Sequence, residues 1–270
     1  MNKQLIQPEV GKISTLIGTI LLVYALTRFI TIPETNIAIQ LLGIYIPITL
    51  NIRTIIDVIV IGLTATGSYW MLIDHPNSQH QKLINHVLVP ALSAWVIGYP
   101  IIQLPFSPLW LMSYLIGGFV FAMVLYAEYI TIDSEDIRQP IAAVLLTAVS
   151  FTIYLTMIII LRNQANRLII ILPAIFLASA LVGYRTFQLH LNIARPFLES
   201  CTIAIISCQV SAALHYWPFS PLAYGLAILA PTYSVTFLLM NKAQGDKLPG
   251  TFIEPSLSLA ILWSLAFWFR

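Results

Sequence analysis

Long apolar stretches alternate with short breaks of charged residues, proline or glycine along almost the whole chain. A helix needs about 20 apolar residues to cross the hydrocarbon core of a bilayer, which is roughly 30 Å thick. Nine stretches approach or reach this length: 12–31, 54–73, 87–104, 109–130, 140–161, 168–188, 198–216, 221–241 and 255–269. The pattern predicts an all-α polytopic membrane protein of about nine transmembrane helices. The short ninth stretch also fits a partial span or an interfacial helix.

The segment between the first two stretches has a different period. From Asn36 to Asn51, isoleucine or leucine recurs mostly at every second position, and a Leu-Gly step interrupts the middle. A period of two residues is typical of a β-strand. The segment therefore predicts a short β-hairpin on the membrane surface, with Pro47 on an edge strand. A surface loop without strand pairing is the alternative.

One pentapeptide occurs twice. Pro-Phe-Ser-Pro-Leu stands at 105–109 and again at 218–222, each time in a short hinge between two apolar stretches. Weaker similarities at a comparable offset predict that four helices are duplicated within a single membrane domain, 1–270. The halves are 12–138 and 139–247, followed by an extra C-terminal helix, 255–270. Because four is an even number, both halves would share one orientation, as parallel repeats do. Chance similarity is the alternative.

Composition supports a membrane environment and narrows the partners. Hydrophobic residues make up 59% of the chain and charged residues only 9%, and the mean hydropathy is +0.87. A soluble domain of this composition would expose too much apolar surface. The net charge of +2, with no basic block, argues against nucleic acid as a partner. We expect the lipid bilayer to surround the chain, and other membrane subunits stay open as partners.

Lysine and arginine are distributed unevenly between the two ends of the predicted helices. With a cytoplasmic N-terminus, eight lie on the cytoplasmic side: Lys3, Lys12, Lys82, Arg138, Arg185, Arg195, Lys242 and Lys247. Five lie on the other side: Arg28, Arg53, Arg162, Arg167 and Arg270. The positive-inside rule then favours a multi-pass protein of the bacterial cytoplasmic (inner) membrane, with the N-terminus cytoplasmic and the C-terminus outside.

Glu128 is the acidic residue of most interest, because it lies about one turn from the cytoplasmic end of the fourth stretch. A carboxylate inside a bundle is costly unless it is paired, and it marks a candidate proton or cation relay. Pairing with Arg185 or Arg195 of the other half is the structural interpretation. An acidic turn that contains Asp133 follows directly.

The seventh stretch carries a line of small and polar residues at helical spacing: Ser200, Ala204, Ser207, Ser211 and His215. Small residues at this spacing let membrane helices approach closely, so the line indicates helix packing. The alternative is a narrow cavity in which Gln209 makes the polar contact.

Motifs of known chemistry are absent from the sequence. The spacings of His75, His80 and His86 fit no helical pair of metal ligands, so we predict no metal site. We also find no Gly-x-Ser-x-Gly elbow, phosphate loop or Cys-x-x-Cys pair, and therefore no catalytic residues. The sequence leaves the cofactor unknown and favours a protein that is not an enzyme, without deciding the question.

Nine helices grouped as four, four and one resemble the architecture of the membrane aromatic prenyltransferases. That family places paired carboxylates in the loops after helices two and six, where they hold magnesium diphosphate. Here only Asp74 stands in the first loop, and the stretch 183–190 has no acidic residue. The resemblance therefore implies a shared fold without the activity.

The chain also resembles an uncharacterised family of multi-pass membrane proteins, a domain of unknown function, from Chloroflexota-like bacteria. The similar segments are 41–45, 70–76, 127–133 and 214–216. This resemblance implies a fold and a bacterial host, and no activity.

Three functions stay open. The first is a non-catalytic accessory or scaffold subunit, or one that binds lipid or pigment. The second is a secondary transporter of a small solute that uses Glu128. The third is an isoprenoid- or lipid-modifying enzyme at the cytoplasmic face. The candidate ligand-binding residues are Glu128, Asp74, His75, Asp133, Arg185, His190, Arg195 and Gln209.

Overall fold

A computed structural model describes residues 8–27, 29–30, 35–41, 44–50, 52–76, 83–133, 135–164, 167–191, 196–245 and 250–270. The chain divides into two compact units, Met1–Ala142 and Ala143–Arg270, called unit 1 and unit 2 below. The division lies within a few residues of the predicted boundary between the halves. The predicted extra C-terminal helix belongs to unit 2.

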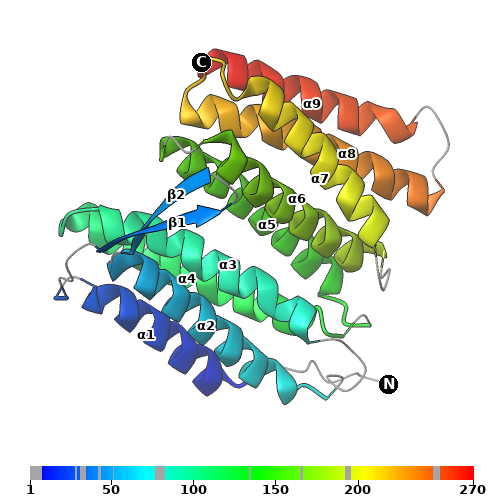
Figure 1. The fold of residues 1–270 in the computed structure, drawn as a ribbon. Helices are drawn as coiled ribbons and strands as arrows, with labels where there is room; N and C mark the ends of the chain where they lie inside the picture. Colours follow the sequence, from blue (N-terminus) through cyan, green and yellow to red (C-terminus); the bar gives the residue numbers. More distant parts are fainter. Residues whose placement is uncertain are drawn as a thin grey trace. The chain divides into compact units, whose positions relative to one another are not determined.

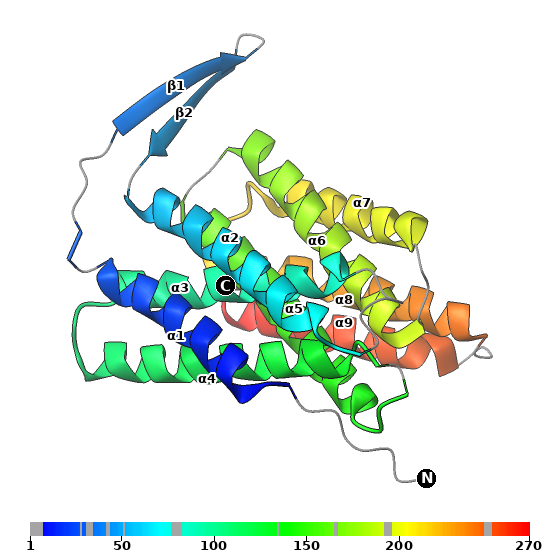
Figure 2. The ribbon, with the colours of Figure 1, turned by 90° about the horizontal axis from the view of Figure 1, so that it is seen from below.

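Unit 1 is built on four helices, which lie side by side (Figures 1 and 2). They are α1 (Val10–Leu26), α2 (Ile52–Ile73), α3 (Ile84–Gln103) and α4 (Pro108–Ile130). The connection between α3 and α4 is only four residues long, 104–107, and connections this short make the two helices antiparallel neighbours. The start of α3 and the end of α4 therefore lie at the same end of unit 1.

Unit 2 contains most of α5 (Gln139–Asn163), together with α6 (Leu168–Leu191), α7 (Phe197–Leu214), α8 (Pro221–Gln244) and α9 (Gly250–Trp268). The helix α8 is the most buried candidate span of the described part of the chain, and α7 is the least buried. Gly245 ends α8 with φ +80°, a left-handed conformation that glycine adopts without strain.

The predicted helices are confirmed in number and place across the described residues, with one qualification. Seven helices, α2 to α8, are long and apolar enough to cross a membrane, whereas α1 and α9 each offer a shorter apolar segment, Val10–Leu26 and Phe252–Trp268. The first helix ends at Leu26, whereas the sequence predicts that the span continues to residue 31. Unit 1 and unit 2 together are a predominantly helical, membrane-type fold.

Two strands occupy the segment of period two. β1 (Thr35–Leu41) pairs with β2 (Ile44–Leu50) in an antiparallel arrangement that sets Thr35 opposite Leu50. Residues 42 and 43, which would form the turn of a hairpin, lie outside the described part of the chain. The predicted hairpin on the membrane surface stays a prediction.

The repeated pentapeptide builds the same local structure twice. Ser107 precedes α4 and Ser220 precedes α8, and each hydroxyl oxygen accepts a hydrogen bond from a backbone N–H of the first turn, at 3.3 and 3.2 Å. The proline that follows each serine stands where a helix needs no N–H donor. The motif is thus a helix start. The larger duplication of four helices is not established by this local similarity.

The core of unit 1 is fixed by a contact between α1 and α3. Tyr24 is 1% exposed, and its hydroxyl donates a hydrogen bond of 2.6 Å to the backbone oxygen of Ala94. The tyrosine ring passes directly over Gly98, where there is no room for a side chain. This contact ties α1 to α3 inside the bundle.

Two tryptophans satisfy carbonyl groups that prolines leave without their usual helical donor. The residue four positions after Ala227 is Pro231, and the indole N–H of Trp263 on α9 donates to the Ala227 oxygen at 3.2 Å. The indole N–H of Trp110 donates to the oxygen of Ile101 at 3.0 Å, four residues before Pro105. Buried carbonyls of this kind are costly when they make no hydrogen bond.

Candidate functional site

A buried acid–imidazole pair lies at one end of unit 1. His86 is in the first turn of α3 and Glu128 is in the last turn of α4. Because the two helices are antiparallel neighbours, these turns face each other. The side chains are 4% and 0% exposed, and His86 Nδ1 lies 2.9 Å from Glu128 Oε2. Burial of a carboxylate is tolerated when such a partner is present.

Thr131 completes this pair. It is the residue that ends α4, and its hydroxyl donates to the backbone oxygen of Glu128 at 3.0 Å. The same oxygen atom of Thr131 lies 3.5 Å from both Glu128 Oε2 and His86 Nδ1. The three side chains form one hydrogen-bonded group at this end of unit 1.

His75 follows the end of α2 and is also buried, at 3% exposure. Its ring packs edge-to-face on Tyr129 of α4, with 4.7 Å between the ring centres. Burial lowers the pKa of His75, and a positive charge on His86 would lower it further, while the carboxylates of Asp133 and Asp136 act in the opposite direction. The imidazole is therefore held neutral near pH 7.

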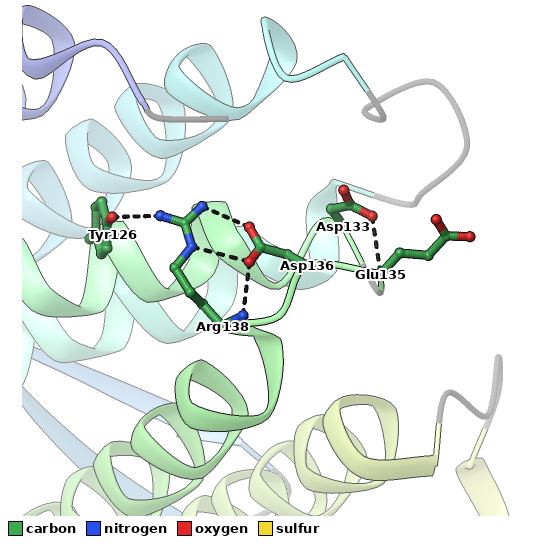
Figure 3. A network of polar contacts seen from close by, with 5 residues as sticks. All are labelled: Tyr126, Asp133, Glu135, Asp136 and Arg138. Carbon is green, nitrogen blue, oxygen red and sulfur yellow. Dashed lines mark hydrogen bonds and ion pairs between the residues drawn. The ribbon is translucent and has the colours of Figure 1, made fainter. Parts of the chain in front are cut away.

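The acidic turn between α4 and α5 is organised by its own side chains (Figure 3). Asp133 accepts a hydrogen bond from the backbone N–H of Glu135 at 3.0 Å. Asp136 accepts three from Arg138, including a pair of 2.7 Å and 3.1 Å to the guanidinium. Arg138 also donates to the hydroxyl of Tyr126 at 2.9 Å. The hydrogen bonds from Arg138 lower the pKa of Asp136.

The other predicted site residues are dispersed among different helices. Asp74, at the end of α2, forms an ion pair with Lys12 of α1. In unit 2, His190 of α6 lies 3.0 Å from the hydroxyl of Thr147 on α5, Arg185 of α6 is buried, and Gln209 is exposed on α7. Arg195 lies outside the described residues. The structure thus gathers His75, Glu128 and Asp133 at one end of unit 1, with Asp74 nearby in sequence.

Sequence reasoning found Glu128 and missed its partner within unit 1. Hydropathy predicts that the third apolar stretch begins at residue 87, which leaves His86 in the preceding loop. The helix begins at Ile84, and this earlier start brings the imidazole onto α3. The pairing of Glu128 with Arg185 or Arg195 stays a prediction.

The line of small residues on α7 is confirmed as a packing face. Ser200, Ala204, Ser207 and Ser211 are each 3% exposed or less. The hydroxyl of Ser207 lies 2.8 Å from that of Thr232 on α8. Hydroxyl pairs of this kind hold membrane helices together. Gln209 lies away from this face.

No group of three or more histidine, cysteine, aspartate or glutamate side chains in the described part of the chain is arranged to hold a metal ion.

Comparisons with curated proteins and with solved structures found no match. One family model matches residues 32–269, nearly the whole chain. The chain therefore belongs to the family described as "Protein of unknown function (DUF5656)".

Proposed function

We propose that this protein is a non-catalytic subunit of a membrane assembly, in which it acts as a scaffold. The observation that carries the proposal is the use of its polar side chains. Lys12 and Asp74 join α1 to α2, His86 and Glu128 join α3 to α4, and Tyr24 joins α1 to α3. These groups tie helices to one another.

In unit 2, polar side chains also join neighbouring helices. Thr147 contacts His190 between α5 and α6. Arg162 of α5 donates to the backbone oxygens of His215 and Trp217, at 2.7 and 3.1 Å, beyond the end of α7. Unpaired polar groups are expensive in lipid, so these contacts rigidify the bundle. A rigid bundle with short connections suits a scaffold better than a catalyst.

Gentle purification of the full chain from its native membrane, followed by native mass spectrometry, tests the proposal. We expect a protein partner in fixed stoichiometry. The matched variant is Glu128→Gln, which keeps the shape of the side chain and should retain the same partner. Recovery of the chain alone, from several detergents and from polymer-extracted native lipid discs, would contradict the scaffold function.

The buried pair supports a second candidate, a proton-coupled carrier of a small solute that uses Glu128. His86 Nδ1 and Glu128 Oε2 lie 2.9 Å apart at the predicted cytoplasmic end of unit 1, where protons can enter from water. The test is a pH gradient across liposomes that hold the purified protein and a pH-sensitive dye. The carrier requires the wild type to dissipate the gradient faster than Glu128→Gln, and equal rates for the variant, wild type and empty liposomes would refute it.

An isoprenoid- or lipid-modifying enzyme is the least supported of the three functions. Two of its predicted residues already make contacts within the bundle: Asp74 pairs with Lys12, and His190 contacts Thr147.

For the location of the protein, we propose the bacterial inner membrane with a cytoplasmic N-terminus, on the basis of the lysine and arginine distribution. Labelling of single cysteines placed in the acidic turn and beside the pentapeptides, from each side of the membrane, tests the orientation.

A further inference from the structure

The helix α7 has two different faces. The buried face carries the packing residues Ser200, Ala204, Ser207 and Ser211. The opposite face is exposed and follows the helix at steps of three and four residues: Leu198, Thr202, Ile205, Gln209 and Ala213, with Tyr216 just beyond the helix end. We call these six residues the α7 outer face. They carry no charged group.

Gln209 places a carboxamide deep within the membrane on this face. It lies about 5 Å along the axis from the midpoint of α7, given a rise of about 1.5 Å per residue. The hydrocarbon core extends about 15 Å on each side of its centre. A glutamine side chain is too short to reach the lipid headgroups from this depth, and an amide in hydrocarbon requires a hydrogen-bonding partner.

The exposed face of α4 provides the contrast. Its residues Met112, Leu115, Ile116, Phe119 and Met123 are all exposed and all apolar. This composition is what contact with lipid tails requires. The α7 outer face differs because a polar group, Gln209, stands between Ile205 and the small residue Ala213. The hydroxyl of Thr202 is used by the backbone oxygen of Leu198, at 2.9 Å, so Thr202 adds a small residue and no further hydrogen-bonding demand.

We propose that the α7 outer face binds the same face of a second copy of this chain. A carboxamide carries one acceptor and two donor hydrogens and no charge, so it is its own complement. A twofold axis beside Gln209 sets the two carboxamides opposite each other, where each donates to the other. Ala213 lies about one turn after Gln209, and a small residue at this position allows close approach of two helices. Ile205, one turn before Gln209, adds apolar contact area.

Other occupants fit this face less well. A lipid headgroup cannot reach the depth of Gln209. A charged side chain from another protein would find no opposite charge among the six residues. The inference rests on the proposed scaffold function and deepens it, because it names one partner and the surface that binds it.

The test uses the full chain in lipid vesicles, with Cys201 and Cys208 replaced by alanine. In this background Ala213→Cys places one cysteine on the α7 outer face, and Phe119→Cys places one on the exposed face of α4 as the matched control. We expect oxidation to convert Ala213→Cys to a disulfide-linked dimer, while Phe119→Cys stays monomeric at the same protein-to-lipid ratio.

Fluorescence transfer between labelled copies gives the association constant. Gln209→Leu should weaken association by about tenfold, and Phe119→Leu should leave it unchanged. Leucine is more apolar than glutamine, so the variant is not expected to impair insertion, and the melting temperature at high dilution checks its folding. Monomers at every protein-to-lipid ratio, or dimers that Gln209→Leu does not weaken, would overturn the inference.

The outcomes separate this inference from the function on which it rests. A monomeric chain that still co-purifies with a different protein leaves the scaffold function standing and removes the α7 dimer. A dimer through α7 with no other protein bound supports the interface and removes the wider assembly. If the Gln209 carboxamide makes its hydrogen bond within its own chain, the protein is monomeric, and this result also contradicts the α7 dimer.

Discussion

Replacement of Gly98 by alanine tests the packing of unit 1 most directly. Any Cβ at this position would overlap the hydroxyl, Cζ and Cε1 of Tyr24. That ring is buried and its hydroxyl is bound to Ala94, so it cannot move without losing the hydrogen bond. Gly98→Ala should therefore force α1 and α3 apart or displace the tyrosine.

The magnitude follows from three contributions. Overpacking costs about 1–3 kcal/mol, and loss of the Tyr24 hydrogen bond costs about 1 kcal/mol. Alanine recovers about 1 kcal/mol through its better helix propensity. The net loss in free energy of unfolding should be about 1–3 kcal/mol. Gly18 is the matched control, because a Cβ there meets nothing within 4 Å, and Gly18→Ala should be neutral or stabilising by up to about 1 kcal/mol.

Reversible unfolding in lipid bicelles, measured for both variants and the wild type, gives the two free-energy changes. A second measurement in a Tyr24→Leu background checks the cause, because Gly98→Ala should cost less once the ring is gone. If Gly98→Ala proved as stable as Gly18→Ala, or if its cost were the same with and without Tyr24, the packing described for α1 and α3 would be wrong.

Three further predictions concern single polar groups. Trp263→Phe should cost about 1 kcal/mol of unfolding free energy, and less in a Pro231→Ala background, where residue 231 supplies its own N–H to Ala227; a double-mutant cycle measures the difference. The pKa of Asp136 is lowered in the folded state, so its stabilising effect is complete above about pH 4 and disappears as the pH falls through the folded pKa. Melting curves of Asp136→Asn against the wild type from pH 7 to 3 should converge at the acid end, and a constant gap would contradict the assignment. The pKa of His75 is lowered by burial, so below about pH 6.5 the unfolded state binds the proton first and stability falls. His75→Phe should flatten the dependence of the melting temperature on pH between 7 and 5, and an unchanged slope would refute this prediction.

Most of the helical architecture could be predicted, because lipid imposes length and composition on every span. The predicted start of α4 differs from the observed one by only one residue. The prolines and the serine of the pentapeptide mark this helix start. The largest errors are at the end of α1 and at the start of α9. Thr27 ends α1 with a hydroxyl bonded to the oxygen of Tyr24, a contact that hydropathy does not reveal.

The candidate site was less predictable, because the faces of neighbouring helices are set by packing. Glu128 stood out as an acid in an apolar stretch. Its pairing with His86 depends on which way α3 and α4 are turned about their axes, and on three residues at the start of α3. The opposite faces of α7 could be listed from spacing, but only packing showed that Ser207 is inside and Gln209 outside.

The bond from Trp263 to Ala227 also determines the register of α9. Within the interior of α8, as the structure describes it, the open acceptor lies one turn before Pro231. A slip of α9 by one helical turn, about 5.4 Å, would bring the indole against carbonyls that already accept a helical hydrogen bond. Pro231 on α8 therefore determines the position along the helix axis at which α9 packs.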